Sequence, residues 1–256
     1  MTSDYTAVTE TWGLPASPEQ LAMQYFRYRL AAEVGHGGAV LEVGCGSGMG
    51  LPYLQNHSRM SVGGDYTLRL LREGRRHIPQ ANLVCMDAQR LPFLDATFDA
   101  VLMLEMIYYL PDHEAAIAEC RRVLKPGGSL MVCLPNRDRP DFNPSPLSTR
   151  YFNTSEIDSL LDGCGFDVRV YGAFPAEETT PRDRALAPLR HFAVRFHLIP
   201  RSMRAKALVK RVLYGKLPEL GAVHDGMAAY SEPVQLDPSA GPNREFKNLY
   251  AIGTRP

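Results

Sequence analysis

The sequence has few of the features that mark secreted, membrane-spanning or metal-binding proteins. Its 256 residues include only five cysteines and one tryptophan. The cysteines are scattered and form no C-x-x-C pair, so they predict neither a disulfide framework nor a metal site. No apolar run approaches the roughly 18 residues of a transmembrane helix, and no charged and apolar leader precedes a cleavage-like site. These absences predict a cytoplasmic protein without a metal centre.

The chain also lacks net charge, because 28 basic residues balance 28 acidic ones. Nothing in the overall charge therefore indicates a nucleic-acid or membrane partner. The balance is not uniform along the chain. Between Arg182 and Lys216 there are ten Lys or Arg residues and one acid, Asp183. One interpretation is a solvated helix face that offsets acids elsewhere. The others are a binding surface for an anionic acceptor, or a stripe that lies on an anionic membrane surface.

The most informative stretch is a short apolar run that breaks into glycines. Residues 39–43 are too apolar to alternate, which predicts a buried strand of a parallel sheet. Gly44, Gly46 and Gly48 follow, and this spacing lets the backbone turn sharply and approach a ligand closely. The helix expected after them would point its positive end at that ligand. A dinucleotide fingerprint needs a further glycine at the position of Met49, so that fit fails.

Strands and helices alternate through the first half of the chain. Apolar runs and turn signals predict strands at 39–43, 61–65, 82–87, 98–104 and 129–134, with two more at 166–172 and 246–252. The alternation over residues 39–135 predicts a doubly wound, mainly parallel sheet. Asp65 ends the second strand, where a nucleotide-binding α/β fold places a carboxylate on the ribose hydroxyls. A turn acid remains the alternative for this residue taken alone.

Five pieces of sequence then occur in a fixed order. They are Leu-Glu-Val-Gly-Cys-Gly-Ser-Gly, Gly64-Asp65, Asp87-Ala88 with Leu-Pro-Phe, Phe98-Asp99 and Arg-Val-Leu-Lys-Pro-Gly-Gly. Together they resemble the class I S-adenosylmethionine-dependent methyltransferases, and among them the type 11 group that includes the ubiquinone/menaquinone C-methyltransferases. The resemblance implies a Rossmann-like α/β fold with a seven-stranded, mainly parallel sheet and an antiparallel edge strand. It also implies S-adenosylmethionine as the cofactor.

The resemblance assigns cofactor contacts to positions in this chain. The glycine turn would hold the methionine part, Asp65 the ribose, and Asp87 with the Ala88 N–H the adenine edge. Glu42 would orient the loop or the cofactor ammonium, and Tyr66 would pack on adenine. The expected cofactor-binding residues are Glu42, Gly44, Cys45, Gly46, Gly48, Asp65, Tyr66, Asp87, Ala88 and Glu105.

The catalytic residue stays unknown at this point. Methyl transfer depends mainly on positioning, and a base matters only for a hydroxyl or carbon acceptor. Family members often carry histidine where this chain has Tyr108 and Tyr109, which places a histidine base there in doubt. The candidates are therefore Tyr108, Tyr109 and His113, with His191, His197 and His224 as further histidines.

Acceptors made of nucleic acid or protein fit the sequence poorly. Methylases of exocyclic amino groups carry an Asn/Asp-Pro-Pro-Tyr turn after the fourth strand, and this chain has Leu-Glu-Met-Ile-Tyr there. Glu105 and Glu114 are spaced like the paired acids of protein arginine methyltransferases, but the residues between them differ. The expected acceptor is a small molecule, methylated on oxygen, that is anionic or linked to a sugar or carrier. N- or C-methylation, or cofactor binding without catalysis, are the alternatives.

Four parts are predicted along the chain. Residues 1–36 form an N-terminal segment and helix that contribute to the substrate and cofactor cover, and residues 37–175 form the cofactor-binding core. Residues 176–245 form a basic helical insert or lid, and residues 246–256 the final edge strand. Ser17 and Pro18 start the leading helix, with Gln20 placed to close a capping box. The tyrosines of that helix are interpreted as packing residues.

Overall fold

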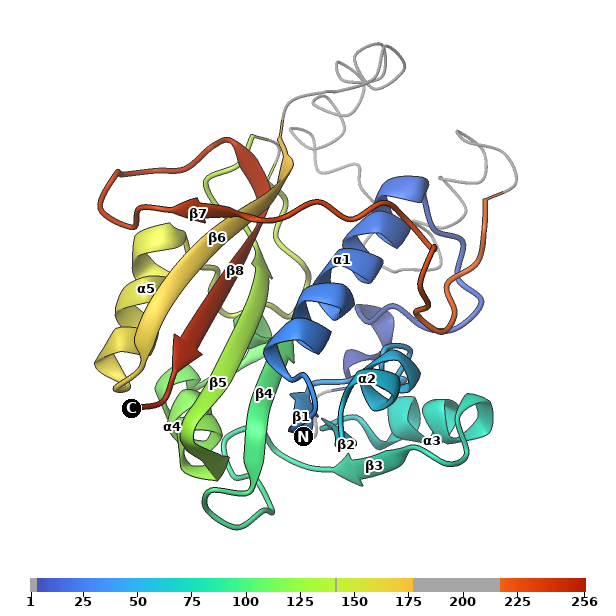
Figure 1. Ribbon diagram of the computed structural model, residues 1–256. Helices are drawn as coiled ribbons and strands as arrows, with labels where there is room; N and C mark the ends of the chain where they lie inside the picture. Colours follow the sequence, from blue (N-terminus) through green and yellow to red (C-terminus); the bar gives the residue numbers. More distant parts are fainter. Residues whose placement is uncertain (1–3, 141, 177–216) are drawn as a thin grey trace.

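The computed structural model describes residues 4–140, 142–176 and 217–256. Its helices and strands follow one another along the chain as shown in Figure 1. In chain order they are η1 (Tyr5–Ala7), α1 (Pro18–Val34), β1 (Ala39–Val43), α2 (Leu51–His57), β2 (Met60–Asp65), α3 (Leu68–His77), β3 (Asn82–Cys85), β4 (Phe98–Leu104), η2 (Ile107–Tyr109), α4 (His113–Val123), β5 (Leu124–Pro135), α5 (Thr154–Gly163), β6 (Asp167–Pro175), β7 (Val234–Leu236) and β8 (Phe246–Thr254).

The strands form one sheet in the order β3-β2-β1-β4-β5-β8-β6-β7. Strands β3, β2, β1, β4 and β5 pair in parallel, each with its neighbour. The pairs β5–β8, β8–β6 and β6–β7 are antiparallel. This arrangement confirms the doubly wound, mainly parallel sheet with an antiparallel edge strand.

Two details of the sheet differ from the prediction. The sheet has eight strands, because the short β7 pairs with β6 through the three partners of Val234–Leu236. The sequence predicted that residues 246–256 form the edge strand. In the structure β8 lies between β5 and β6, and β7 is the edge strand. Both pairings join segments far apart in the chain, and no local sequence pattern records them.

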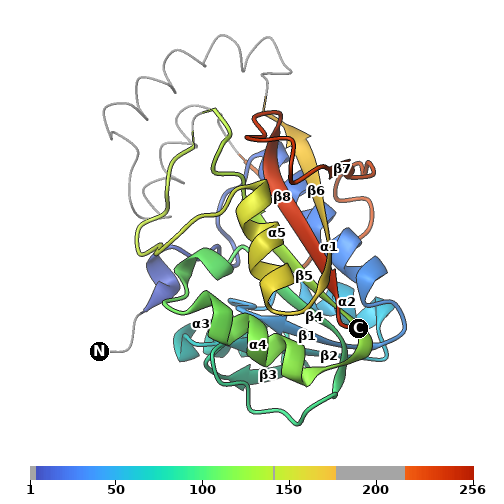
Figure 2. The same ribbon diagram turned by 90° about the vertical axis from the view of Figure 1, so that its left-hand side faces the viewer.

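Helices cover both faces of the sheet (Figure 2). One core cluster joins α4 and α5 to one face through residues such as Ile117, Leu161 and Val101. The second cluster joins α1 and α2 to the other face, through Phe26, Leu54 and Leu102 among others. Burial on both faces explains why β1 and β4 are apolar throughout.

Helix α1 begins as the sequence predicts. The Ser17 side chain accepts from the N–H of Gln20, and the Gln20 side chain accepts from the N–H of Ser17, which closes the capping box. The helix packs against β4 and β5 and against α2. It therefore brings its inner face to the carboxyl ends of the parallel strands.

The described segment that precedes β7, from residue 217, crosses α1 (Figure 1). Asp225 accepts hydrogen bonds from the hydroxyls of Tyr25, on α1, and Tyr53, on α2. The part of the predicted insert that is described, residues 217–245, contains β7 and no helix. The basic stretch from Arg182 to Lys216 lies outside the described residues. Among the residues described, no helix has the length and apolar character to cross a membrane.

Candidate functional site

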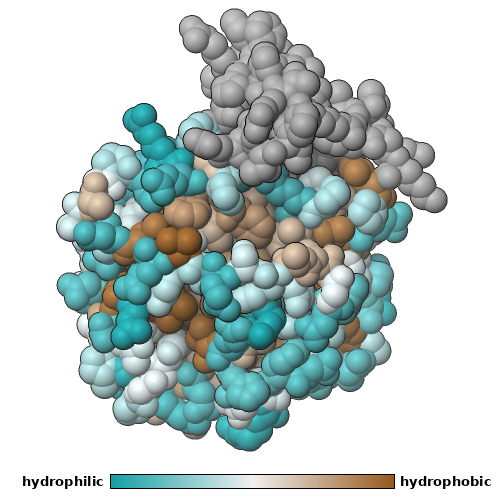
Figure 3. Space-filling view, turned by 45° about the horizontal axis from the view of Figure 1, so that its top comes forward, coloured by the Kyte–Doolittle hydropathy of each residue, from teal (hydrophilic) through white to brown (hydrophobic). Residues whose placement is uncertain are grey.

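A cavity of about 600 Å³ opens at the carboxyl ends of β1, β2 and β4. This is the edge at which open α/β sheets bind ligands. Its wall comes from the segment before α1, from α1 itself, from the glycine turn after β1, from η2 and from the loop after β5. Figure 3 shows one face of the molecule, on which hydrophobic side chains lie among hydrophilic ones. The volume lies within the range of ligand-binding cavities, about 300–1,000 Å³.

The glycine turn forms the floor of the cavity. Gly44 and Gly46 have φ of +79° and +58°, which side chains other than glycine rarely adopt. A Cβ on Gly44 would also lie 2.7 Å from the Cγ of Met106. Gly48 shares the positive φ, at +72°, but it packs against Ile78 and Leu51 and is not part of the cavity wall. Its place in the turn is thus structural.

Asp65 holds the turn in place from the end of β2. Its Oδ2 accepts from the N–H of Gly46 at 2.8 Å, and its Oδ1 accepts from the N–H of Thr67 at 2.7 Å. Burial raises the pKa of Asp65, and these two backbone bonds partly offset that effect. Each carboxylate oxygen can accept more than one hydrogen bond. Asp65 can therefore order the turn and still receive hydroxyl groups of a ligand.

Glu42 is a buried acid at the end of β1, next to the turn. It is 1% exposed, and its Oε1 accepts from the hydroxyl of Tyr28 at 2.6 Å. Burial raises the pKa of Glu42 to about 7, although the hydrogen bond from Tyr28 and the charge of Arg27 act in the opposite direction. Its Oε2 is buried and has no hydrogen-bond partner among the residues described here. A buried carboxylate oxygen in this state is suited to a cationic ligand group.

The other expected cofactor contacts lie on the same wall. Tyr66, Asp87 and Ala88 line the cavity next to β2 and β3. Tyr66 is 44% exposed, which is unusual for a large aromatic side chain. The Oδ1 of Asp87 accepts from the N–H of Gln89 at 2.9 Å. With Cys45 and Glu105, nine of the ten expected cofactor-binding residues line this one cavity, and Gly48 is the exception.

Glu105 connects three parts of the wall. It follows β4 with a φ of +58°, a conformation that costs about 1–3 kcal/mol in residues other than glycine and often marks functional sites. Its Oε2 accepts from the hydroxyl of Tyr108 at 3.0 Å, and its Oε1 accepts from the Nδ2 of Asn248 at 3.0 Å. Arg27 lies between Glu105, at 3.7 Å, and Glu10, at 3.4 Å. Helix α1, η2 and β8 therefore meet at this carboxylate.

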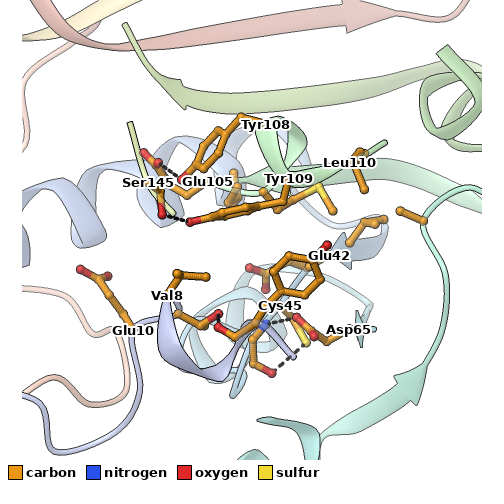
Figure 4. A pocket seen from close by; sticks show the side chains of 18 of the residues that line it. Val8, Glu10, Glu42, Cys45, Asp65, Glu105, Tyr108, Tyr109, Leu110 and Ser145 are labelled. Atoms are coloured by element: carbon orange, nitrogen blue, oxygen red, sulfur yellow. Dashed lines mark hydrogen bonds between the residues drawn. The ribbon is translucent and has the colours of Figure 1, made fainter. Parts of the chain in front are cut away.

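The three catalytic candidates differ in position. Tyr108 and Tyr109 line the cavity on the side opposite Glu42, Cys45 and Asp65 (Figure 4). Burial raises the pKa of Tyr109 to about 12 and places that of Tyr108 well above its usual range. Both hydroxyls are therefore protonated at neutral pH. His113 is outside the cavity wall and packs its ring against Phe152, with centroids 5.0 Å apart.

Of the three further candidate histidines, His224 is the one in the described part of the chain. His224 is outside the cavity wall, and its Nδ1 is 2.9 Å from the carbonyl oxygen of Asp225. His191 and His197 lie outside the described residues. No side chain of the described wall is thus a histidine.

Residues 4–16 form a flap that closes the cavity from the N-terminal side. Tyr5, Val8, Thr9 and Glu10 of this flap line the cavity. Trp12 fixes the flap, because its Nε1–H donates to the carbonyl oxygen of Ser47 at 3.0 Å and its ring stacks on His77 at 4.5 Å. Backbone hydrogen bonds with residues 218–220 hold the other end of the flap.

We expect Trp12→Ala to speed the release of a bound ligand by roughly 5–100-fold, because it removes contacts of about 1–3 kcal/mol that keep the flap closed. Stopped-flow displacement of S-adenosylhomocysteine measures this rate. Trp12→Phe keeps a ring on His77 and should give a smaller increase. An unchanged rate in Trp12→Ala would show that the flap does not control release.

Several residues of the wall were not found from the sequence. They are Arg27 and Tyr28 on α1, Asn248 on β8, and the flap residues Tyr5 and Glu10. The aromatic residues of the leading helix were noted, but they were assigned to packing. That is right for Tyr25, which belongs to the core. Tyr28 packs in that core too, and it also carries the hydrogen bond to Glu42.

The charge of the wall favours a cationic ligand. Its acidic residues are Glu10, Glu42, Asp65, Asp87 and Glu105, and its basic residues are Arg27 and Arg139. A site with excess carboxylates attracts positive groups. In the described part of the chain, no cluster of three or more His, Cys, Asp or Glu side chains could hold a metal ion.

Comparisons with known proteins agree with this geometry. Residues 41–132 match the family model described as a methyltransferase domain. A probable S-adenosylmethionine-dependent methyltransferase of Mycolicibacterium smegmatis is 35% identical over 135 residues, 50% of this chain and 52% of that protein. A phosphatidylethanolamine N-methyltransferase of Cereibacter sphaeroides is 36% identical over 41% of this chain and 55% of its own length. A demethylmenaquinone methyltransferase of Corynebacterium urealyticum is 36% identical over 41% of this chain and 45% of its own length.

The match thus spans about half the length of these curated relatives. Among solved structures, a methyltransferase of Archaeoglobus fulgidus superposes with a TM-score of 0.58 at 15% identity, over 94% of this chain and 95% of that one. That likeness concerns the fold. The cofactor of this class of domain is S-adenosylmethionine, and the buried Glu42 and the acidic wall fit its positive charge. Residues 41–132 therefore form a methyltransferase domain of the class I S-adenosylmethionine-dependent superfamily.

Proposed function

We propose that this protein transfers the methyl group of S-adenosylmethionine to an oxygen atom of a small-molecule acceptor that is anionic or linked to a sugar or carrier. The observation that supports it is the cavity at the sheet edge, which nine of the expected cofactor-binding residues line. When bound, the cofactor supplies a methyl group activated by its sulfonium. The glycine turn would hold its methionine part and the edge of its ribose, Asp65 its ribose hydroxyls, and Glu42 its ammonium.

The chemistry of the opposite wall favours an acceptor that needs no strong base. Tyr108 and Tyr109 are protonated at neutral pH, because burial raises the pKa of both. Their rings can orient an acceptor, but their protonated hydroxyls do not remove its proton. An oxygen that is already ionised at neutral pH, such as that of a carboxylic acid or of a phenol with a lowered pKa, meets this condition.

Arg139 gives the acceptor side of the cavity a positive charge. It lies on the loop after β5 with Asn143 and Ser145, and all three residues line the cavity. An ionised acceptor would be attracted to this end, whereas the carboxylates near β1 and β2 attract the cofactor. This distribution of charge suits a cationic cofactor at one end and an anionic acceptor at the other.

A methyl-transfer assay with labelled cofactor and a panel of phenols, carboxylic acids, amines and quinols tests the proposal. We expect labelled methyl ethers or esters as products. The KM of an anionic acceptor should rise steeply between about 0.05 and 0.5 M salt, because salt screens the attraction. N- or C-methylated products would contradict transfer to oxygen. Tight binding of S-adenosylhomocysteine without turnover on any acceptor would indicate a non-catalytic binding protein.

A further inference from the structure

The acceptor side of the cavity is an array of tyrosine rings. Tyr5, Tyr108, Tyr109 and Tyr151 all line the cavity. The ring centroids of Tyr5 and Tyr109 are 5.5 Å apart, those of Tyr109 and Tyr108 are 4.6 Å apart, and those of Tyr108 and Tyr151 are 4.5 Å apart. These spacings are typical of interacting aromatic pairs. Three separate segments, the flap, η2 and the loop after β5, contribute to one continuous aromatic wall.

The hydroxyl groups of Tyr108, Tyr109 and Tyr151 already have partners in the protein. Tyr108 donates to Glu105 at 3.0 Å, Tyr109 and Ser145 share a hydrogen bond of 2.7 Å, and the hydroxyl of Tyr151 accepts from the N–H of Ser145 at 2.9 Å. Figure 4 shows the first two of these bonds. What this part of the wall offers a ligand is therefore mainly the surface of the rings.

Aromatic surface of this kind binds either another aromatic ring or a cation. The positive groups of the cofactor already have Glu42 and the other carboxylates of the cavity as partners. The acceptor end carries Arg139, whose guanidinium lies 6.0 Å from the ring centroid of Phe142 and would repel a cation. An aromatic ring that carries an ionisable oxygen matches both the aromatic surface and the positive charge of Arg139.

We propose that the acceptor is an aromatic hydroxyl compound whose ring packs against the wall formed by Tyr5, Tyr108, Tyr109 and Tyr151. This inference rests on the proposed function and narrows its acceptor to one chemical class. The ring of Tyr109 is a specificity-determining group, because it contacts both Tyr5 of the flap and Tyr108 of η2. Closing of the flap then places aromatic surface on more than one side of the acceptor.

Two uncharged probes test the ring alone. Anisole and methoxycyclohexane share a methyl ether and a six-membered ring, and only anisole is aromatic. Each is titrated against the full-length protein by ligand-observed NMR, with and without S-adenosylhomocysteine. We expect anisole to bind roughly 3–10-fold more tightly, which is the effect of one or two aromatic contacts. Equal responses to the two probes, including no response to either, would overturn the proposal.

Variants of Tyr109 separate the ring from its hydroxyl. Tyr109→Leu should abolish the preference for anisole, whereas Tyr109→Phe should keep it. Tyr53→Leu is the matched control, because Tyr53 is 2% exposed in the core on the other face of the sheet. It should keep the preference even if it lowers stability. A preference that persists in Tyr109→Leu, or displacement of anisole by tetramethylammonium, would contradict an aromatic acceptor site.

Calorimetry on the same samples distinguishes this inference from the proposed function. Failure to bind S-adenosylhomocysteine would contradict the proposed function, whatever the probes show. Binding of S-adenosylhomocysteine without a preference for anisole would leave the proposed function intact and overturn the aromatic acceptor.

Discussion

Asp65→Ala is expected to abolish measurable cofactor binding and to lower the free energy of unfolding by about 2–6 kcal/mol. The substitution leaves the N–H groups of Gly46 and Thr67 without their acceptor, and each buried donor left in this way costs about 1–3 kcal/mol. The glycine turn loses its link to β2 at the same time. Calorimetry with S-adenosylhomocysteine and denaturant unfolding measure the two effects.

Asp87→Ala is the matched comparison for this prediction. Asp87 also follows a strand of the parallel sheet, but it is exposed, and its hydrogen bonds go to Gln89. We expect roughly 10–100-fold weaker cofactor binding with little change in stability, because one charge-assisted hydrogen bond contributes about 1.5–3 kcal/mol. If both variants bind the cofactor like the wild type, the site is not the one described here.

Glu42→Gln is expected to have opposite effects on stability and on cofactor binding. The pKa of Glu42 has its ordinary value of 4.5 in the unfolded chain and is raised to about 7 in the folded protein. Between these values the folded state binds more protons, so its stability falls as the pH rises. Above pH 7 the buried charge costs about 3 kcal/mol. The glutamine variant avoids this cost, so it should be more stable than the wild type at pH 8 and nearly equal to it at pH 4.

Cofactor binding should change in the other direction. Without the carboxylate, affinity for S-adenosylhomocysteine at pH 8 should fall roughly 10–150-fold, the effect of one charge-assisted hydrogen bond. Affinity of the wild type should fall about tenfold for each pH unit below 7, because its carboxylate is then protonated. The variant should show no such dependence. A wild type whose affinity is the same at pH 5.5 and pH 8 would contradict the role of Glu42.

The sequence was sufficient to predict the parallel half of the sheet. The apolar runs at 39–43 and 98–104 coincide with β1 and β4, because strands buried on both faces must be apolar along their whole length. The prediction of β5 began later than the strand does, since residues 124–128 continue directly from α4. The glycine and proline residues of this stretch are typical of a helix end, so the sequence predicted a turn. They are equally compatible with the bulge in the β4–β5 pairing, which lets the strand begin earlier.

The parts that the sequence did not predict depend on contacts between distant segments. Arg27 occupies an ordinary position on helix α1, and only its packing shows that Glu10 and Glu105 flank it. Asn248 is likewise one polar residue in a strand until β8 is placed beside β5. Nine of the expected cofactor residues line the cavity because they lie at or just after the ends of strands, so that a short local motif fixes their position in space.

The position of β8 has a consequence for synthesis on the ribosome. Strand β6 ends at Pro175 and its partner β8 begins at Phe246. At about 5–20 residues per second, β8 follows β6 by roughly 4–14 s. During that interval β5 has an unpaired edge and β6 has no place in the sheet. The nascent chain is then open to mispairing with other strands. A chaperone that shields this edge should therefore raise the yield of folded protein more than one that acts on the completed chain.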